Sequence, residues 1–242
     1  MLNSQSLRTT SQNNAIYGFA PLPKIETPTS NAELHHRSII FYDVPSERVR
    51  NLLPEEFSLS EKTVLSIESF LDDGRTRFEQ SNYRLHISLR GKACAWLLGT
   101  SLGSLSAVTT RHLYRLPWHL SAMEFQVGFD AMAQRYTSYR LRSQSQWANA
   151  SWEITDTGLP LTTSNNNESN DYFIRRDGAI GSYQTIHRPA FATRGKLITG
   201  NCDMLQTLGI LTADELQCPT YISLQRAVIC EIKKSLGVMI AA

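Results

Sequence analysis

The chain has 242 residues, of which 41% are hydrophobic and 19% charged, and its formal net charge is +2. That length suffices for one large β-rich domain or two small ones, and so small a net charge favours neither nucleic acid nor an anionic membrane as a partner. The sequence shows no charged-then-apolar leader and no apolar run of about 18 residues, which predicts a cytoplasmic protein.

Metal and cofactor chemistry find no support in the sequence. His35 and His36 are adjacent, and adjacent residues on a strand point to opposite faces, so one ion would not bind both. No nucleotide-binding or serine-hydrolase motif occurs, and we expect no cofactor. Four cysteines are scattered without metal-site spacing, and the first and last of them lie in apolar runs typical of small core residues: Cys94, Cys202, Cys218 and Cys230.

The first third of the chain predicts an arm followed by strands. Residues 1–33 are rich in Ser, Asn, Gln and Thr and are expected to form a polar arm, with residues 34–242 forming a single domain. Residues 37–42 read as a strand. After Pro45, the apolar residues Val49, Leu52 and Leu53 have helical spacing up to Pro54.

Residues 63–70, 83–89 and 93–100 predict three successive strands, with turns at residues 73–74 and 90–91. The middle segment alternates most clearly. One face carries Tyr83, Leu85, Ile87 and Leu89, and the other carries Arg84, His86, Ser88 and Arg90.

The segment 110–129, TRHLYRLPWHLSAMEFQVGF, concentrates polar residues around Pro117 and continues as an alternating strand. One face is expected to be covered and carries His119, Met123, Phe125, Val127 and Phe129. The other carries Leu120, Glu124 and Gln126. An imidazole at the edge of an apolar enclosure can act as acid or base near neutral pH, although the spacing alone favours a structural histidine bonded to a backbone carbonyl.

The second half of the chain predicts further strands and two short helices. Residues 135–144 and 147–155 read as strands, and in the first Tyr136, Ser138, Arg140, Arg142 and Gln144 are expected to share a polar face. A polar loop at 161–171 precedes a hairpin, 172–176 and 182–187, around Asp177-Gly178. Residues 201–208 and 212–216 look helical, the latter with a Thr-x-x-Glu capping box, and residues 221–232 form a last strand. The pattern indicates a β-rich α+β fold, a curved antiparallel sheet or barrel enclosing a cavity.

Four segments carry a resemblance to a known family: IIFYDVPSERVRNLLPEEFSL at 39–59, NYRLHISLRG at 82–91, TRHLYRLPWHL at 110–120, and SYQTIHRPAF at 182–191 followed by a helix and PTYISLQRAVICEI. In order and spacing they resemble the acetoacetate decarboxylase-like superfamily, within it an uncharacterised bacterial branch. The resemblance covers most of residues 37–232.

The departures from that family bear on chemistry. The decarboxylases form a Schiff base through a Pro-Lys-Lys segment, but Trp118 and His119 follow Pro117 here, and neither forms an imine. Leu85 and His112 replace two acidic landmarks, while Arg111 is retained. These departures from the family pattern therefore argue against acetoacetate decarboxylation. Lys92 could supply an amine, but a lone strand lysine usually extends to solvent.

The resemblance implies relatives that perform aldol, dehydration or cyclisation chemistry on keto acids. We hypothesise a cofactor-free lyase or cyclase of small-molecule or secondary metabolism, acting on an enolisable keto or unsaturated carbonyl acid, with histidine as acid, base or nucleophile in place of lysine. Arginine would bind a carboxylate through its bidentate fork. The predicted catalytic residues are His119, Arg111 and His112, and the predicted substrate-binding residues are Tyr42, Glu68, Tyr83, Tyr114, Trp118 and Glu124.

Two alternatives remain open. The chain could be a non-catalytic small-molecule-binding protein that kept the pocket and lost the chemistry, or a structural subunit of a homo-oligomer. His187, followed by Arg188 and Pro189, is expected in a turn.

Overall fold

The computed structural model describes residues 30–72, 77–105, 117–161, 168–176, 179–188, 190–233 and 238–239. Within them the chain is mostly strand: β1 Ser30–Pro45, β2 Phe57–Ser58, β3 Lys62–Asp72, β4 Phe78–Leu89, β5 Lys92–Leu102, β6 Trp118–Leu120, β7 Ala122–Asp130, β8 Arg135–Gln144, β9 Ala150–Leu161, β10 Glu168–Arg176, β11 Ala179–His187, β12 Ala192–Cys202, β13 Tyr221–Lys233 and β14 Val238–Met239. The helices are short: the 3-10 turns η1 Ser46–Arg48 and η2 Arg50–Leu52, and the α-helices α2 Asp203–Thr207 and α3 Ala213–Leu216. None of the helices in the described ranges is long and apolar enough to cross a membrane. The β-rich fold class is confirmed.

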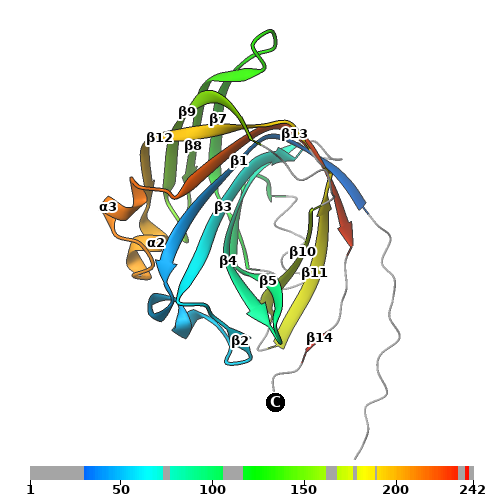
Figure 1. Ribbon diagram of the computed structural model, residues 1–242, viewed down its shortest axis with the longest axis vertical. Helices are drawn as coiled ribbons and strands as arrows, with labels where there is room; N and C mark the ends of the chain where they lie inside the picture. The colour runs from blue at the N-terminus through cyan, green and yellow to red at the C-terminus, as the bar shows by residue number, and fades with distance from the viewer. Residues whose placement is uncertain are drawn as a thin grey trace, which may run out of the picture.

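Seven strands close into a ring. The sheet runs β14-β11-β10-β5-β4-β3-β1-β13-β12-β9-β8-β7, and β13 also pairs with β11. Strands β11, β10, β5, β4, β3, β1 and β13 therefore form a barrel, and β12, β9, β8 and β7 extend from it as an open sheet, which we call the flange (Figure 1). Most neighbouring strands are antiparallel, as predicted, but β10 and β6 both pair with β5 in parallel.

Strand β13 makes the ring possible because it pairs with three strands. Along its length it pairs with β1, over residues 221–232. On its other edge, residues 223–225 pair with β12 and residues 230–233 pair with β11. One long strand thus joins the flange to the barrel at its start and closes the barrel at its end.

The main apolar core lies between the barrel and the flange. It takes the outward faces of the barrel strands and the facing side of the flange, including Ile40, Leu65, Ile67, Leu85, Leu141, Trp152 and Ile154. The alternation predicted for 83–89 is confirmed, because Tyr83, Leu85 and Ile87 are buried in this core. The predicted covered face of β7 is confirmed as well: Met123, Phe125, Val127 and Phe129 pack against the same core.

Several sequence predictions need correction. The helix expected after Pro45 is two separate 3-10 turns, because Val49 (φ −112°) interrupts the helical backbone. Tyr136 does not share the polar face of β8: the β7–β8 register shifts between Gly128 and Phe129, which turns Tyr136 inward beside Tyr139 while Ser138 stays exposed. Residues 192–200, to which the sequence assigned no element, form β12 together with residues 201–202, so the helix predicted at 201–208 begins only at Asp203.

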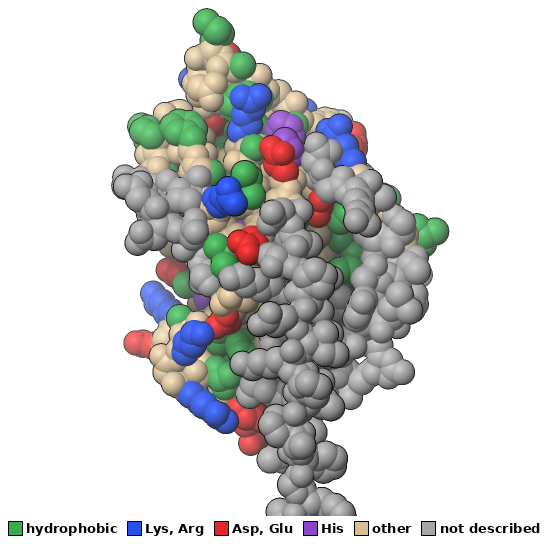
Figure 2. Space-filling view, turned by 90° about the vertical axis from the view of Figure 1, so that its right-hand side faces the viewer, with side chains coloured by type: hydrophobic (Ala, Val, Ile, Leu, Met, Phe, Trp, Pro, Cys, Tyr) green, Lys and Arg blue, Asp and Glu red, His purple; other side chains and the backbone are tan. Residues whose placement is uncertain are grey.

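Other predicted elements agree with the structure. The hairpin around residues 177–178 is formed by β10 and β11, and α3 has the predicted capping box between Thr212 and Glu215. Cys94 and Cys230 are buried. Strand β1 begins at Ser30, within the segment expected to be an arm, and the rest of that segment lies outside the described residues. On the face shown in Figure 2, basic and acidic side chains are interspersed.

Candidate functional site

The residues predicted for the site do not all gather in one place. Arg111, His112 and Tyr114 lie outside the described residues. Tyr42 and Tyr83 are fully buried in the core between barrel and flange, where the Tyr42 hydroxyl donates a hydrogen bond to a carbonyl oxygen of α3. These two tyrosines therefore face away from the barrel interior.

Strand β6 directs its two predicted residues to opposite faces. Trp118 pairs with Thr100 and His119 pairs with Ser101, and residues paired across two strands point to the same face. Thr100 donates a hydrogen bond to Asn82 inside the barrel, so Trp118 lies on the inward side. His119 is half-buried, and its ring stacks on Trp147 with a centroid distance of 4.4 Å and an interplanar angle of 5°. Its predicted role as a base stays a prediction.

The two predicted carboxylates have opposite environments. Glu124 is exposed on β7 and accepts a hydrogen bond from Gln126 (2.5 Å). Glu68 on β3 is 1% exposed and lies inside the barrel. A carboxylate buried this deeply must be paired, because an isolated ionised group in an apolar interior is strongly disfavoured.

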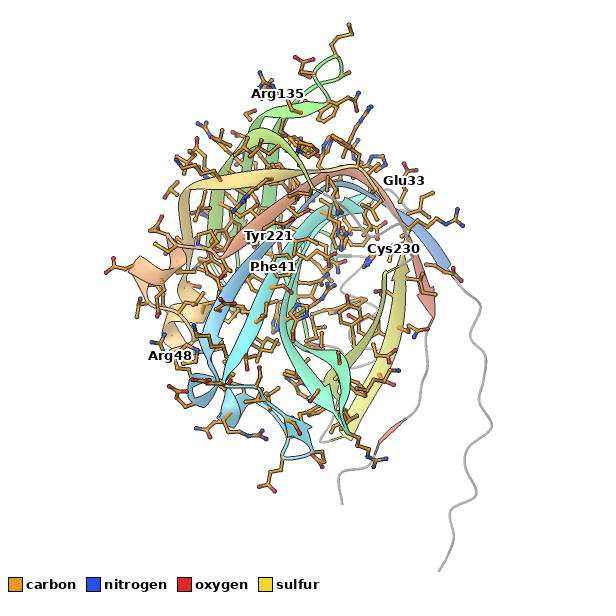
Figure 3. All side chains as sticks on the ribbon, in the orientation of Figure 1. Glu33, Phe41, Arg48, Arg135, Tyr221 and Cys230 are labelled. Atoms are coloured by element: carbon orange, nitrogen blue, oxygen red, sulfur yellow. The ribbon has the colours of Figure 1, made fainter. Side chains whose placement is uncertain are left out.

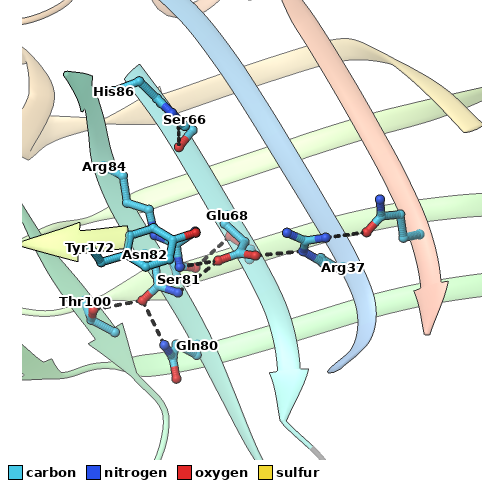
Figure 4. A network of polar contacts seen from close by, with 12 residues as sticks. Arg37, Ser66, Glu68, Gln80, Ser81, Asn82, Arg84, His86, Thr100 and Tyr172 are labelled. Carbon is cyan, nitrogen blue, oxygen red and sulfur yellow. Dashed lines mark hydrogen bonds and ion pairs between the residues drawn. The ribbon is translucent and has the colours of Figure 1, made fainter. Parts of the chain in front are cut away.

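Two arginines and an asparagine surround Glu68 (Figure 4). Arg37 Nε on β1 donates to one carboxylate oxygen at 2.7 Å, and Arg84 Nη2 on β4 lies 2.5 Å from the other, which also accepts from Asn82 Nδ2 at 3.1 Å. Arg37 Nη1 is held in turn by Gln225 on β13, at 2.7 Å. We call Arg37, Glu68 and Arg84 the ionic cluster.

The ionic cluster carries a formal charge of +1. Among the described residues, Glu68 is the one carboxylate bonded to either guanidinium. Burial alone would raise the pKa of Glu68, but Arg84 and Arg37 outweigh it and hold that pKa well below its usual range, so the carboxylate is ionised at neutral pH. One buried positive charge therefore remains without a carboxylate partner in the part of the chain that the structure describes.

Two tyrosines from the opposite wall of the barrel adjoin the ionic cluster. Tyr172 on β10 accepts a hydrogen bond from Arg84 Nη1 at 3.3 Å, and the guanidinium carbon lies 4.4 Å from the Tyr172 ring centre. Tyr172 stacks on Tyr183 of β11 at 5.0 Å. Burial raises the pKa of both tyrosines, so their hydroxyls remain protonated donors.

His187 ends β11, within electrostatic range of the ionic cluster. Burial, and then the charges of Arg37 and Arg84 against the opposing charge of Glu68, lower the pKa of His187 to about 4, so its ring is neutral at neutral pH. It is 4% exposed, and its Nδ1 finds no hydrogen-bond partner among the described residues, nor does Nε of Arg84. Unpaired buried polar atoms are rare, and a bound ligand is one way to satisfy them.

Sequence reasoning identified Glu68 but assigned no site role to Arg37, Arg84 or His187. Two signals were available. Glu68 lies in an otherwise largely apolar strand, and Arg84 lies on the face opposite to Tyr83 and Leu85. His187, expected in a turn, is the last residue of a strand, and only barrel closure brings it to the cluster.

Comparisons with known proteins identify the fold. No protein-family model matches the chain, and no curated protein matches it in sequence. Among solved structures, acetoacetate decarboxylase from Legionella pneumophila is 13% identical over 99% of this chain and 100% of that chain, with a TM-score of 0.57. An acetoacetate decarboxylase-like enzyme from Sphingomonas wittichii is 6% identical over 86% and 92%, with a TM-score of 0.53.

A third similar structure is the enduracididine biosynthesis enzyme MppR complexed with pyruvate, 11% identical over 89% of this chain and 91% of that chain, with a TM-score of 0.51. Together the three show that this chain has the acetoacetate decarboxylase-like fold, as the sequence resemblance predicted. At identities this low the likeness concerns the fold and not the chemistry.

Proposed function

We propose that this acetoacetate decarboxylase-like barrel is an enzyme that enolises a small 2-oxo acid at the ionic cluster, as the first step of a lyase or cyclase reaction in small-molecule biosynthesis. The observation that carries the proposal is the buried ionic cluster with its surplus positive charge, whose charges act on a neutral His187 with an unpaired Nδ1. One structural neighbour, MppR, was solved with pyruvate, a 2-oxo acid.

The surplus charge favours a carboxylate ligand. The unpaired Nε of Arg84 can donate to a substrate carboxylate or carbonyl oxygen, and charge-assisted bonds of this kind are the stronger class of hydrogen bond. A substrate carboxylate would bring the net charge of the cluster to zero. It would also offset the two guanidinium charges that lower the pKa of His187, so the histidine becomes a better base when substrate is bound.

The proposed step moves one proton. His187 Nδ1 takes a proton from C3 of the bound 2-oxo acid, the C–H electron pair forms a C2–C3 double bond, and the carbonyl electron pair moves to oxygen. The resulting enolate oxygen is stabilised by Arg84 and by the protonated hydroxyl of Tyr172. Aldol, dehydration and cyclisation reactions of 2-oxo acids can all proceed from such an enolate.

Exchange of the C3 protons of pyruvate for deuterium, followed by NMR, tests the proposal directly. We expect the protein to accelerate exchange, His187→Asn to abolish the acceleration, and Arg84→Gln to raise KM for pyruvate. His119→Ala, measured in parallel, decides between the two histidines: loss of exchange in His119→Ala with His187→Asn unaffected would contradict the assignment to His187.

A ligand-binding protein without catalysis is the second candidate. It is favoured by the pKa of His187, about 4 in the unliganded protein, which makes this imidazole a weak base. Saturable binding of pyruvate that Arg84→Gln weakens, without accelerated exchange in any variant, would identify this function.

A further inference from the structure

Three aromatic rings lie on the inward face of the barrel, beyond the ionic cluster. The Phe41 ring on β1 lies 6.1 Å from the His86 ring on β4 and 5.8 Å from the Tyr221 ring on β13, centre to centre. Phe41 pairs with Ser66 on β3, two residues from Glu68, and Ser66 is bonded to His86 Nε2 at 2.9 Å. We call Phe41, His86 and Tyr221 the ring set; Figure 3 labels Phe41 and Tyr221 on their neighbouring strands.

The ring set lies where the interior face meets solvent. His86 is exposed and Phe41 and Tyr221 are half-buried, whereas Glu68 and Arg84 on the same face are buried. On the other side of the ionic cluster, the next inward residue of β3, Phe70, packs with Leu34 and Cys230 in a separate apolar cluster. Within the described residues, the interior face therefore runs from the ring set at the solvent side, through the buried ionic cluster, to a buried apolar cluster. A ligand that enters from the solvent side would pass the ring set before it reaches the ionic cluster.

We infer that the substrate of the barrel site is a 2-oxo acid bearing an aromatic or heteroaromatic ring, with its carboxylate at Arg84 and its ring against Phe41, His86 and Tyr221. This rests on the proposed function and deepens it by naming the substrate class.

The spacing suits one molecule that spans both regions. Arg84 and His86 are two residues apart on β4, roughly 7 Å at about 3.3 Å per residue. In a 3-aryl-2-oxopropanoate only two carbon atoms separate the carboxylate from the ring, so the charged and aromatic ends fall within that span. The guanidinium carbon of Arg84 lies 4.4 Å from the centre of the Tyr172 ring, so an aromatic ring also adjoins the carboxylate end.

Such a ring also assists the proposed chemistry. The proton to be removed is on C3, which in a 3-aryl-2-oxopropanoate is attached to both the carbonyl carbon and the ring. Conjugation with the ring stabilises the enolate that forms, which lowers the demand on a base as weak as His187.

Equilibrium binding of phenylpyruvate and pyruvate to the full chain, by calorimetry, tests the substrate class. We expect phenylpyruvate to bind at least about tenfold more tightly than pyruvate, because its ring buries apolar area and each aromatic contact adds binding free energy beyond that burial. Phe41→Leu should weaken phenylpyruvate binding roughly 3- to 10-fold and leave pyruvate binding unchanged. Phe191→Leu is the matched control, since Phe191 is 59% exposed and outside the ring set. Tyr221→Leu repeats the test should Phe41→Leu fail to fold.

Equal affinities for the two acids, no binding of either, or equal effects of Phe41→Leu on both would overturn the inference. Deuterium exchange on the same samples separates it from the proposed function. Ring-dependent binding without accelerated exchange supports the substrate class and contradicts the enolisation. Accelerated exchange of pyruvate without any ring-dependent binding does the reverse.

Discussion

Glu68→Gln is the most direct test of the ionic cluster. The substitution keeps the shape of the side chain and removes the negative charge that Arg37 and Arg84 share. Glu68 is 1% exposed, and its two guanidinium contacts are 2.7 and 2.5 Å long. Hydrogen bonds to charged groups contribute about 1.5–3 kcal/mol each, and removing one partner of a buried ion pair costs about 3–5 kcal/mol.

We therefore expect Glu68→Gln to lower the free energy of unfolding by about 3–5 kcal/mol, measured by urea denaturation at neutral pH. That is a large part of the roughly 5–15 kcal/mol typical of a folded domain. The matched control is Glu153→Gln, which removes a carboxylate 2.7 Å from Arg140 on the flange surface. Both members of that pair are about a third exposed or more, so the expected loss is about 1 kcal/mol or less.

The pH dependence of this difference adds a second check. The pKa of Glu68 is lower in the folded protein than in the unfolded chain, where a glutamate titrates at about pH 4.3. Its contribution to stability is therefore present above that pH and is lost as the pH falls further. The gap between the wild type and Glu68→Gln should be constant from neutral pH to about pH 5 and narrow below about pH 4. A neutral-pH loss no larger than that of Glu153→Gln would refute a desolvated, paired cluster.

Three further predictions concern the base, the core and a helix cap. If neutral His187 is the base, kcat/KM for exchange is independent of pH above about pH 4 and falls at lower pH. The fall in kcat should begin at a higher pH than the fall in kcat/KM, because the carboxylate of bound substrate offsets the arginine charges and raises the pKa of His187. A fall in both parameters at about pH 6.5 would contradict this. Gly99→Ala would place a Cβ 2.5 Å from the Trp147 ring and should cost about 1–3 kcal/mol in urea denaturation, and an unchanged stability would show that Trp147 moves freely. Thr212→Ala removes the side chain that accepts from the Glu215 amide and should cost about 1 kcal/mol in thermal unfolding; a change near zero would mean that α3 frays without consequence.

Local pattern predicted the strands better than the site. The alternation at 83–89 correctly separated Tyr83 and Leu85 from Arg84, because a strand with one face in an apolar core must alternate. The same rule was wrong for Tyr136, since a one-residue shift between β7 and β8 reverses the faces and leaves no mark in the sequence.

The site itself depends on barrel closure. Arg37 and Glu68 meet through the pairing of β1 with β3, and His187, 150 residues after Arg37, comes near them only because β11 pairs with both β10 and β13. No periodicity contains that information. His119 illustrates the converse: its position after Pro117 was prominent in the sequence, while the register of β6 turns its ring toward Trp147.

Strand β13 has a consequence for biosynthesis. It is translated after every other strand of the seven-stranded ring, and until it pairs with β1 and β11 their backbone edges are unprotected. Open strand edges readily join those of other chains, so nascent or C-terminally shortened polypeptides would need chaperone protection against aggregation. The ionic cluster likewise becomes desolvated only when β13 pairs with β11, because the barrel interior is not enclosed before that step.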